Sequence, residues 1–176
     1  MKSVTERVYL TDFILACLAY CLFVGSDSIV KYLGSDYSIV QIIFVNSWFA
    51  LIPIVLYTQT LNGWRKLKKA NFTVHFFRAL TMALALFFGY TGFYRLPMVT
   101  MYSIVFLIPL MITIGSVFFL GEVVRWKRFT AILIGFIGAI ISINPFGTEY
   151  NNYIFLALFC PIFTSASYLI VRKYGL

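Results

Sequence analysis

Residues 78–145 contain three long apolar runs that are interrupted at only two short polar segments. The interruptions fall at residues 95–97 and at residues 121–128. A helix that crosses a lipid bilayer needs about 20 predominantly apolar residues in a row, and the core of a soluble protein rarely contains such runs. The pattern therefore predicts transmembrane helices.

The composition of the whole chain favours the same class of protein. Hydrophobic residues make up 61% of the sequence and charged residues 11%, and the mean hydropathy is +0.91. Soluble domains contain about 25% charged residues. The net charge of +8 is compatible with nucleic-acid binding, but basic residues in short loops also fix the orientation of membrane proteins. We therefore expect an all-α polytopic membrane protein without a nucleic-acid partner.

Six segments are apolar and long enough to serve as membrane-spanning helices. Each has about 16–22 residues, which is near the length that crosses the hydrocarbon layer at about 1.5 Å per residue. The sequence thus predicts a transmembrane bundle of six helices, at residues 13–33, 38–58, 75–94, 99–120, 129–144 and 153–171.

The distribution of Lys and Arg predicts that the N-terminus is cytoplasmic. With this orientation, all 14 basic residues except Lys31 and Arg95 fall on the cytoplasmic side. Proteins of the inner membrane carry such an excess of positive charge in their cytoplasmic loops. We therefore expect a multi-pass protein of the cell inner (plasma) membrane.

The first and sixth segments are similar to each other. Residues 9–34 align with residues 150–175, and the identical pairs include Ser26 with Ser167 and Gly34 with Gly175. A repeat of five helices places its second copy upside down in the membrane, as in many carriers. We therefore expect a first five-helix repeat over residues 1–146 and the first helix of a second repeat over residues 147–176.

The order of several residues between positions 26 and 145 resembles that of one transporter family. The chain is similar to the EamA-type branch of the drug/metabolite transporter superfamily, and its residues 27–32 resemble those of a subgroup that contains S-adenosylmethionine uptake transporters. The residues that carry the resemblance are Lys31, Gln41, Ile42, Ile43, Phe44, Arg78, Tyr94, Leu96, Pro97, Pro109, Gly121, Glu122, Gly135 and Gly138.

The resemblance implies a ten-helix carrier built from two inverted repeats, of which this sequence covers about the first six helices. It implies secondary transport of a small metabolite by alternating access, for example S-adenosylmethionine or a similar amino-acid- or nucleoside-type solute. Because the sequence stops after the sixth segment, the alternative is a truncated, non-transporting remnant or an assembly subunit of a split carrier. A subunit of that kind needs a second half-transporter or a second copy as its partner.

Polar residues within the apolar segments are the first candidates for a substrate site. A carboxylate inside a bilayer usually faces a cavity, a partner or a proton path, so Asp27 is one candidate, although it can also lie at the interface beside Lys31. Asn46 requires a hydrogen-bond partner, which is either a solute or another helix. Related carriers often have Arg at the position of Asn46, so the resemblance does not carry over a substrate preference.

Aromatic residues and a proline complete the predicted substrate site. Aromatic rings in the third and fourth segments either line a pocket for a ring-bearing or cationic metabolite or pack against helices and lipid. Pro109 should kink the fourth segment, and kinked helices recur at carrier sites. The predicted substrate-binding residues are Asp27, Asn46, Tyr90, Tyr94, Tyr102 and Pro109.

Two arginines at the ends of the third segment are candidate gate residues. Arg78 either gates the inner mouth or contacts lipid phosphate. Arg95 either lines the outer mouth or caps the carbonyls of a helix end. Near the inner surface, we expect Glu122 to form an ion pair with Arg125 or Arg128.

The sequence contains no pattern of residues typical of an enzyme. It lacks a Ser/His/Asp set, a His/Cys spacing for metal and a Gly-rich phosphate loop. Cys17, Cys21 and Cys160 all lie in apolar segments, where packing is the simplest role for them. We therefore expect no enzymatic activity, no metal and no other cofactor.

Overall fold

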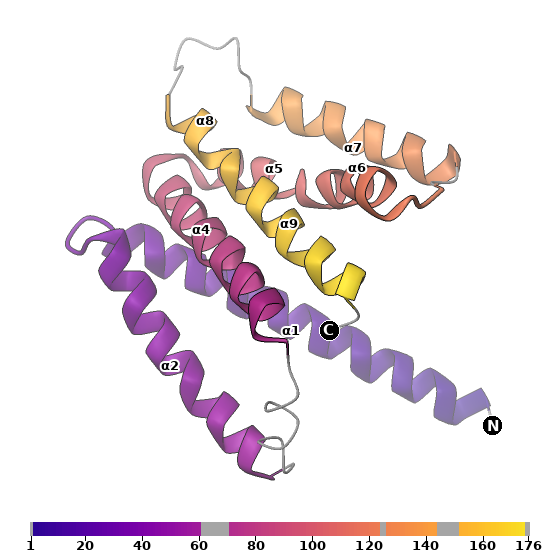
Figure 1. Ribbon diagram of the computed structural model, residues 1–176, viewed down its shortest axis with the longest axis horizontal. Helices are drawn as coiled ribbons and strands as arrows, with labels where there is room; N and C mark the ends of the chain where they lie inside the picture. The colour runs from indigo at the N-terminus through magenta and orange to yellow at the C-terminus, as the bar shows by residue number, and fades with distance from the viewer. Residues whose placement is uncertain (1, 61–70, 124–125, 144–151, 175–176) are drawn as a thin grey trace.

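The computed structural model describes residues 2–60, 71–123, 126–143 and 152–174, and these residues form a bundle of helices (Figure 1). Within these ranges there is no β-strand, which confirms the all-α class. The helices are α1 (Lys2–Leu33), α2 (Ile39–Thr60), α4 (Phe72–Arg95), α5 (Met98–Val105), α6 (Ile108–Leu120), α7 (Trp126–Ile143), α8 (Tyr153–Ala157) and α9 (Phe159–Tyr174).

Each of the six predicted segments contains a helix, and five stretches of described residues are long and apolar enough to cross a membrane. The predicted segment 129–144 corresponds to α7, whose apolar part is shorter, at Phe129–Gly138, and Asn144 lies outside the described residues. The polytopic membrane class is thereby confirmed. The five long stretches are Thr11–Leu33, Ile39–Gln59, Phe72–Arg95, Met98–Leu120 and Tyr153–Tyr174.

Prolines interrupt two of these spans. Pro109 has no N–H to donate to the carbonyl of Val105, and the N–H of Leu107 bonds instead to the carbonyl of Ile104 at 3.0 Å. The expected kink at Pro109 is therefore a break between α5 and α6. Pro161 likewise has no N–H to donate to the carbonyl of Ala157, and the helix is interrupted there between α8 and α9.

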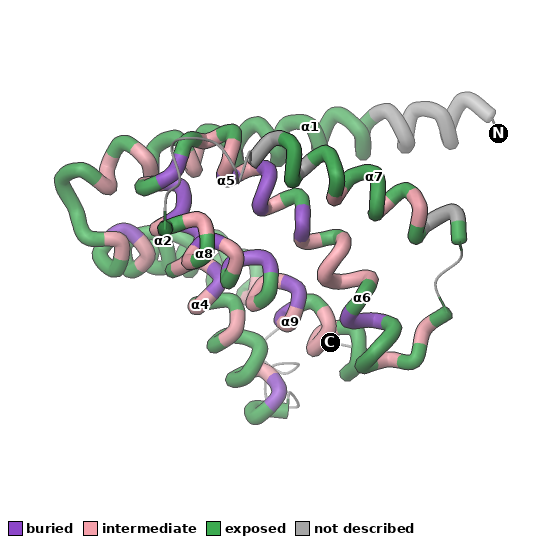
Figure 2. The backbone as a smooth tube through the Cα atoms, turned by 90° about the horizontal axis from the view of Figure 1, so that it is seen from above, coloured by how far each residue is buried: buried purple, intermediate pink, exposed green. Residues whose placement is uncertain are grey.

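The largest buried cluster lies where α4, α5, α8 and α9 meet. Figure 2 shows buried residues mainly on these helices, whereas α1 and α2 are largely exposed. Helix α9 packs most extensively against α4 and α6, so the sixth segment is an integral part of the bundle. The exposed apolar faces of α1 and α2 suit contact with lipid or with further helices. The cluster consists of Phe93, Leu96, Met101, Ile104, Ala157 and Cys160.

Gly121 ends α6 in the left-handed conformation, with φ of 68°. Its N–H bonds to the carbonyl of Val117, and the N–H of Glu122 bonds to the carbonyl of Ser116, so both satisfy carbonyls of the last turn. An L-residue with a side chain would cost about 1–2 kcal/mol in this conformation. Gly121 thus allows the left-handed backbone conformation that ends α6.

Glu122 pairs with a residue that the sequence did not indicate. Its Oε1 lies 2.9 Å from Nη2 of Arg172 in α9, and both side chains are partly exposed. Arg125 lies outside the described residues, as does the side chain of Arg128, so the pairs expected with them are untested. The observed pair joins the C-terminal ends of α6 and α9.

Candidate functional site

A cavity of about 740 Å³ lies between α1, α2 and α4. Its volume is in the range of roughly 300–1,000 Å³ that is typical of small-molecule sites. Most of its wall is apolar, as expected for a site inside a bilayer. The polar side chains of Ser26, Gln41, Asn46 and Tyr90 are exceptions within this wall.

A hydrogen bond between Asn46 and Tyr90 joins two helices at this cavity. Asn46 Nδ2 in α2 donates to the Tyr90 hydroxyl in α4 at 2.9 Å. Tyr90 is only 7% exposed, because it packs with Val30 of α1 and Ile42 of α2. The packing orients the phenol, and both polar groups line the cavity. Asn46, which is itself exposed, therefore has the helix partner that an amide within a membrane span needs and also borders a solute-sized space.

Asp27 forms a second polar contact, with Tyr102 of α5. The Tyr102 hydroxyl donates to Asp27 Oδ2 at 2.9 Å, and the Tyr102 ring packs edge-on against Phe93 with centroids 5.2 Å apart. Neither residue lines the cavity between α1, α2 and α4. Asp27 and Tyr102 thus form a contact between α1 and α5 outside the lining of this cavity.

Lys31 lies one turn after Asp27 and caps the end of α4. Its Nζ donates to the carbonyls of Leu96 at 2.7 Å and Phe93 at 3.4 Å. Residues four apart lie on the same face of a helix, so Asp27 and Lys31 hold the end of α1 against the α4–α5 corner. Lys31 thus performs the kind of capping role that the sequence suggested for Arg95, whose own capping and gate roles stay predictions.

We expect the substitution Lys31→Met to lower the free energy of unfolding by about 1.5–3 kcal/mol, since hydrogen bonds to charged groups contribute this much. Methionine keeps the length of the side chain but leaves the carbonyl of Leu96, which is 1% exposed, without its donor. Thermal denaturation in detergent measures the effect. Lys173→Met, at an exposed position of α9, is the control. Equal stability of both variants would contradict the capping role.

Two other predicted residues, Tyr94 and Arg95, pack beside each other at the C-terminal end of α4. The Arg95 guanidinium lies 4.7 Å from the ring centroid of Tyr94 and 5.1 Å from that of Tyr153. The Tyr94 ring lies so close to Gly34 that a Cβ at Gly34 would come within 2.6 Å of Cδ2. Tyr94 therefore fills the space above the turn after α1, outside the cavity.

Arg78, the second predicted gate residue, is exposed on α4. Its backbone carbonyl accepts hydrogen bonds from Thr81 Oγ1 at 2.9 Å and from Ser167 Oγ at 3.5 Å. The structure thus places the start of α4 against α9. The gate role of its guanidinium stays a prediction.

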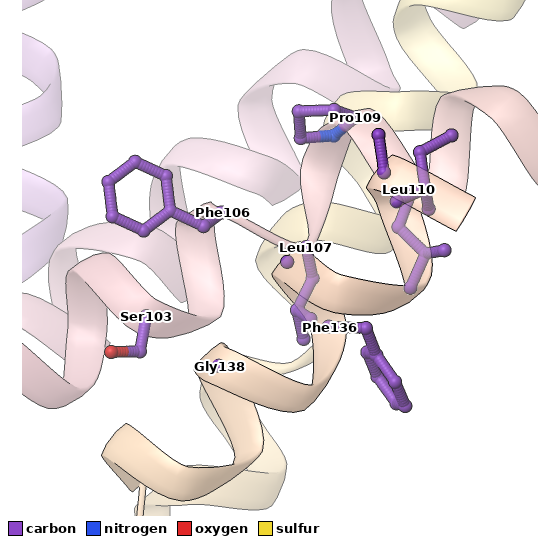
Figure 3. Close-up of a pocket in the computed structure, with 10 residues that line it drawn as sticks. Ser103, Phe106, Leu107, Pro109, Leu110, Phe136 and Gly138 are labelled. Atoms are coloured by element: carbon purple, nitrogen blue, oxygen red, sulfur yellow. The ribbon is translucent and has the colours of Figure 1, made fainter. Parts of the chain in front are cut away.

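Pro109 borders a different cavity, of about 580 Å³, between α7 and the break of α5 and α6. Figure 3 shows Phe106, Leu107 and Pro109 from the broken span and Phe136 from α7, which all line this cavity. The structure therefore distributes the six predicted substrate residues over several places. Only Asn46 and Tyr90 share the cavity between α1, α2 and α4.

Sequence reasoning did not select Ser26, Gln41 and Cys21, although they line the same cavity. Gln41 Oε1 accepts hydrogen bonds from the N–H and the hydroxyl of Ser38, which fixes the start of α2. The signal for Ser26 and Gln41 was their polar character in apolar surroundings, which also applied to other residues. Among the described residues, no group of three or more His, Cys, Asp or Glu side chains is arranged to hold a metal ion.

Comparison with known proteins gives one family and several curated relatives. The model of the EamA-like transporter family matches residues 11–144. An S-adenosylmethionine uptake transporter of Rickettsia conorii is 30% identical over 175 residues, which cover 96% of this chain and 57% of that protein. Its counterpart in Rickettsia bellii is 34% identical over 134 residues, which cover 72% of this chain and 43% of that protein.

A relative with a different named solute extends the comparison. A riboflavin transporter of Vibrio cholerae is 26% identical over 150 residues, which cover 84% of this chain and 50% of that protein. The chain spans about half the length of the curated relatives it matches. No solved structure matches it.

Proposed function

The chain belongs to the EamA-like transporter family, and on this premise we propose that it takes part in secondary transport of a small metabolite by alternating access. The observation that carries the proposal is the cavity of about 740 Å³, with the bonded pair Asn46 and Tyr90 in its apolar wall. A few oriented polar groups in an apolar cavity are typical of small-molecule sites. The inner membrane is the location that the distribution of positive charge favours.

For the solute, we propose S-adenosylmethionine or a similar amino-acid- or nucleoside-type molecule. S-adenosylmethionine and riboflavin, the solutes named for the relatives, both join a planar heterocycle to a polar chain. The exposed rings of Tyr37 and Phe49 offer surfaces for a heterocycle, and the amides of Gln41 and Asn46 offer donors and acceptors. These features support an amino-acid- or nucleoside-type solute, and they do not distinguish S-adenosylmethionine from similar molecules.

Alternating access requires helices on both sides of the solute, and we propose that a second set of helices faces α1, α2 and α4. The curated relatives are about twice as long as this chain. In this scheme residues 1–146 form one five-helix repeat and residues 147–176 begin its inverted copy. The second set of helices belongs to a longer chain, to a separate half-transporter or to a second copy.

Protection of Cys21 from a maleimide reagent tests the site directly, because this exposed thiol lines the cavity. Cys17 lies one turn earlier and does not line it, so single-cysteine variants retaining Cys21 or Cys17 form a matched pair. We expect S-adenosylmethionine to slow the labelling of Cys21 several-fold and to leave Cys17 unchanged. Uptake of a labelled metabolite panel into proteoliposomes then identifies the transported solutes.

Two outcomes would contradict this proposal. The site is wrong if every solute that is taken up leaves the labelling of Cys21 unchanged. Transport itself is wrong if neither the chain nor its complete assembly takes up any member of a broad panel. In that case, native electrophoresis in mild detergent separates the alternatives, since an assembly subunit migrates as a stable complex and a remnant does not.

A further inference from the structure

We propose that Asp27 is a proton-binding site that couples transport to the proton gradient, with Tyr102 as its positioning residue. This inference rests on the proposed transport function. In each cycle Asp27 takes one proton from the aqueous phase on one side and releases it to the other side. The bond that forms and breaks is the O–H bond of the carboxyl group, and the proton comes from water.

The position of Asp27 is the first reason for this inference. Asp27 lies within the membrane-spanning stretch Thr11–Leu33, six residues before its end, which is about 9 Å along a helix axis. Its side chain is partly buried and turned toward α5, where it meets Tyr102. A carboxylate at such a depth is costly and is usually retained for a function.

The second reason is that Asp27 forms no ion pair with a Lys or Arg side chain among the described residues, where the pair found is Arg172 with Glu122. Lys31 is the cation nearest to it along α1, but its ammonium group bonds to the carbonyls of Leu96 and Phe93. The titratable groups near Asp27 on other helices are Tyr102 of α5, which contacts it, and Tyr90 of α4 and Cys160 of α9, which lie close enough to interact with its charge. All three are acids that carry no positive charge in either protonation state, so a proton on Asp27 is the simplest way to neutralise the site.

A proton fits this site better than a metal ion. Ions such as Ca²⁺ take six or more oxygen ligands. The described partner of the Asp27 carboxylate is a single phenol, and no group of three metal-binding side chains exists among the described residues. A proton needs only one carboxylate oxygen, which the site supplies.

Tyr102 allows Asp27 to change its protonation state without losing its hydrogen bond. A phenol donates to a carboxylate and can accept from a carboxylic acid, so the contact persists while its direction reverses. Tyr102 also lies in α5, one turn before the break at Phe106 and Leu107. A change in the protonation state of Asp27 therefore occurs close to the break between α5 and α6. In this proposal, that break is where the helices move in response to the proton.

Solute accumulation driven by a pH gradient tests the coupling in proteoliposomes that contain the complete transporter. For one proton per solute, wild-type protein should change accumulation by up to about tenfold per pH unit of gradient. Asp27→Asn should abolish this response, and Asp27→Glu should restore part of it. Asp36→Asn, at an exposed position in the turn after α1, is the control and should respond like wild type. Tyr102→Phe should keep a response but shift its pH profile.

Infrared spectroscopy of the purified chain in lipid provides a readout that does not depend on transport. We expect a carboxylic-acid band that titrates with pH in wild-type protein and in Asp36→Asn, and that is missing in Asp27→Asn. Accumulation that follows the gradient in Asp27→Asn, or a titrating band unaffected by that substitution, overturns the inference and leaves transport intact. A wild-type protein that titrates at Asp27 but moves no solute contradicts the transport function instead.

Discussion

Replacing Asn46 with leucine is expected to weaken solute binding about ten- to a hundredfold, because loss of a hydrogen-bond partner of a buried group, here Tyr90, corresponds to about 1–3 kcal/mol. Leucine has nearly the same size but neither donates nor accepts. The substitution removes the donor to the Tyr90 hydroxyl and the amide that borders the cavity. The apparent KM for uptake, measured with the solute identified in the panel, should rise with a smaller change in the maximal rate.

Controls distinguish solute recognition from packing between helices. Asn71→Leu makes the same chemical change at an exposed position before α4, where the side chain forms no cap, and should leave the KM unchanged. Tyr90→Phe removes the same interhelical hydrogen bond while Asn46 remains. If Asn46 served only to join α2 to α4, both Asn46→Leu and Tyr90→Phe would lower thermal stability equally and would not change the KM.

Substitution of Gly92 by valine is expected to destabilise the bundle by about 3 kcal/mol or more, which is the upper part of the range for overpacked cores. A Cβ at Gly92 would lie 2.5 Å from Sδ of Met101 and 3.2 Å from Cβ of Ala157. Both neighbours are fully buried, and Ala157 belongs to a helix backbone that cannot move alone. The clash should separate α4 from α5 and α8, and thermal denaturation in detergent should detect it.

Gly25→Val is the matched control for this prediction. Gly25 lies within α1, and a Cβ there would meet no atom within 4 Å. Both substitutions place the same β-branched residue in a helix, so differences in helix propensity largely cancel. Equal denaturation temperatures for the two variants would show that the contact of α4 with α5 and α8 does not limit stability.

The membrane class and the positions of the spans could be predicted because the bilayer imposes its thickness on the sequence. Each apolar run must be about 20 residues long and must end at polar residues, and both features are local. The interruption at Pro109 could also be predicted from the local sequence, because a proline removes a hydrogen bond to a carbonyl only one turn earlier. The break before Pro161 has the same cause, yet the prediction treated 153–171 as a single segment.

The candidate site could be predicted only in part. Polar and aromatic residues in apolar segments stood out one by one, and Asn46, Tyr90, Asp27 and Tyr102 were among them. The sequence did not show which of them pair. Asn46 and Tyr90 are 44 residues apart along the chain, and Asp27 and Tyr102 are 75 residues apart. Tyr94 and Pro109 satisfied the same criteria but lie away from the cavity between α1, α2 and α4.

The sequence by itself determined which segments enter the bilayer, since hydrophobicity and length act on each segment separately. Tertiary structure alone decided which side chains meet, because the rotation of each helix about its axis depends on the packing of its neighbours. That packing directed Asn46 toward Tyr90, Asp27 toward Tyr102 and Lys31 toward the end of α4. It also placed the Lys31 ammonium group at the carbonyl of Leu96, because the close contact of Gly34 with Tyr94 brings the end of α1 to the α4–α5 corner.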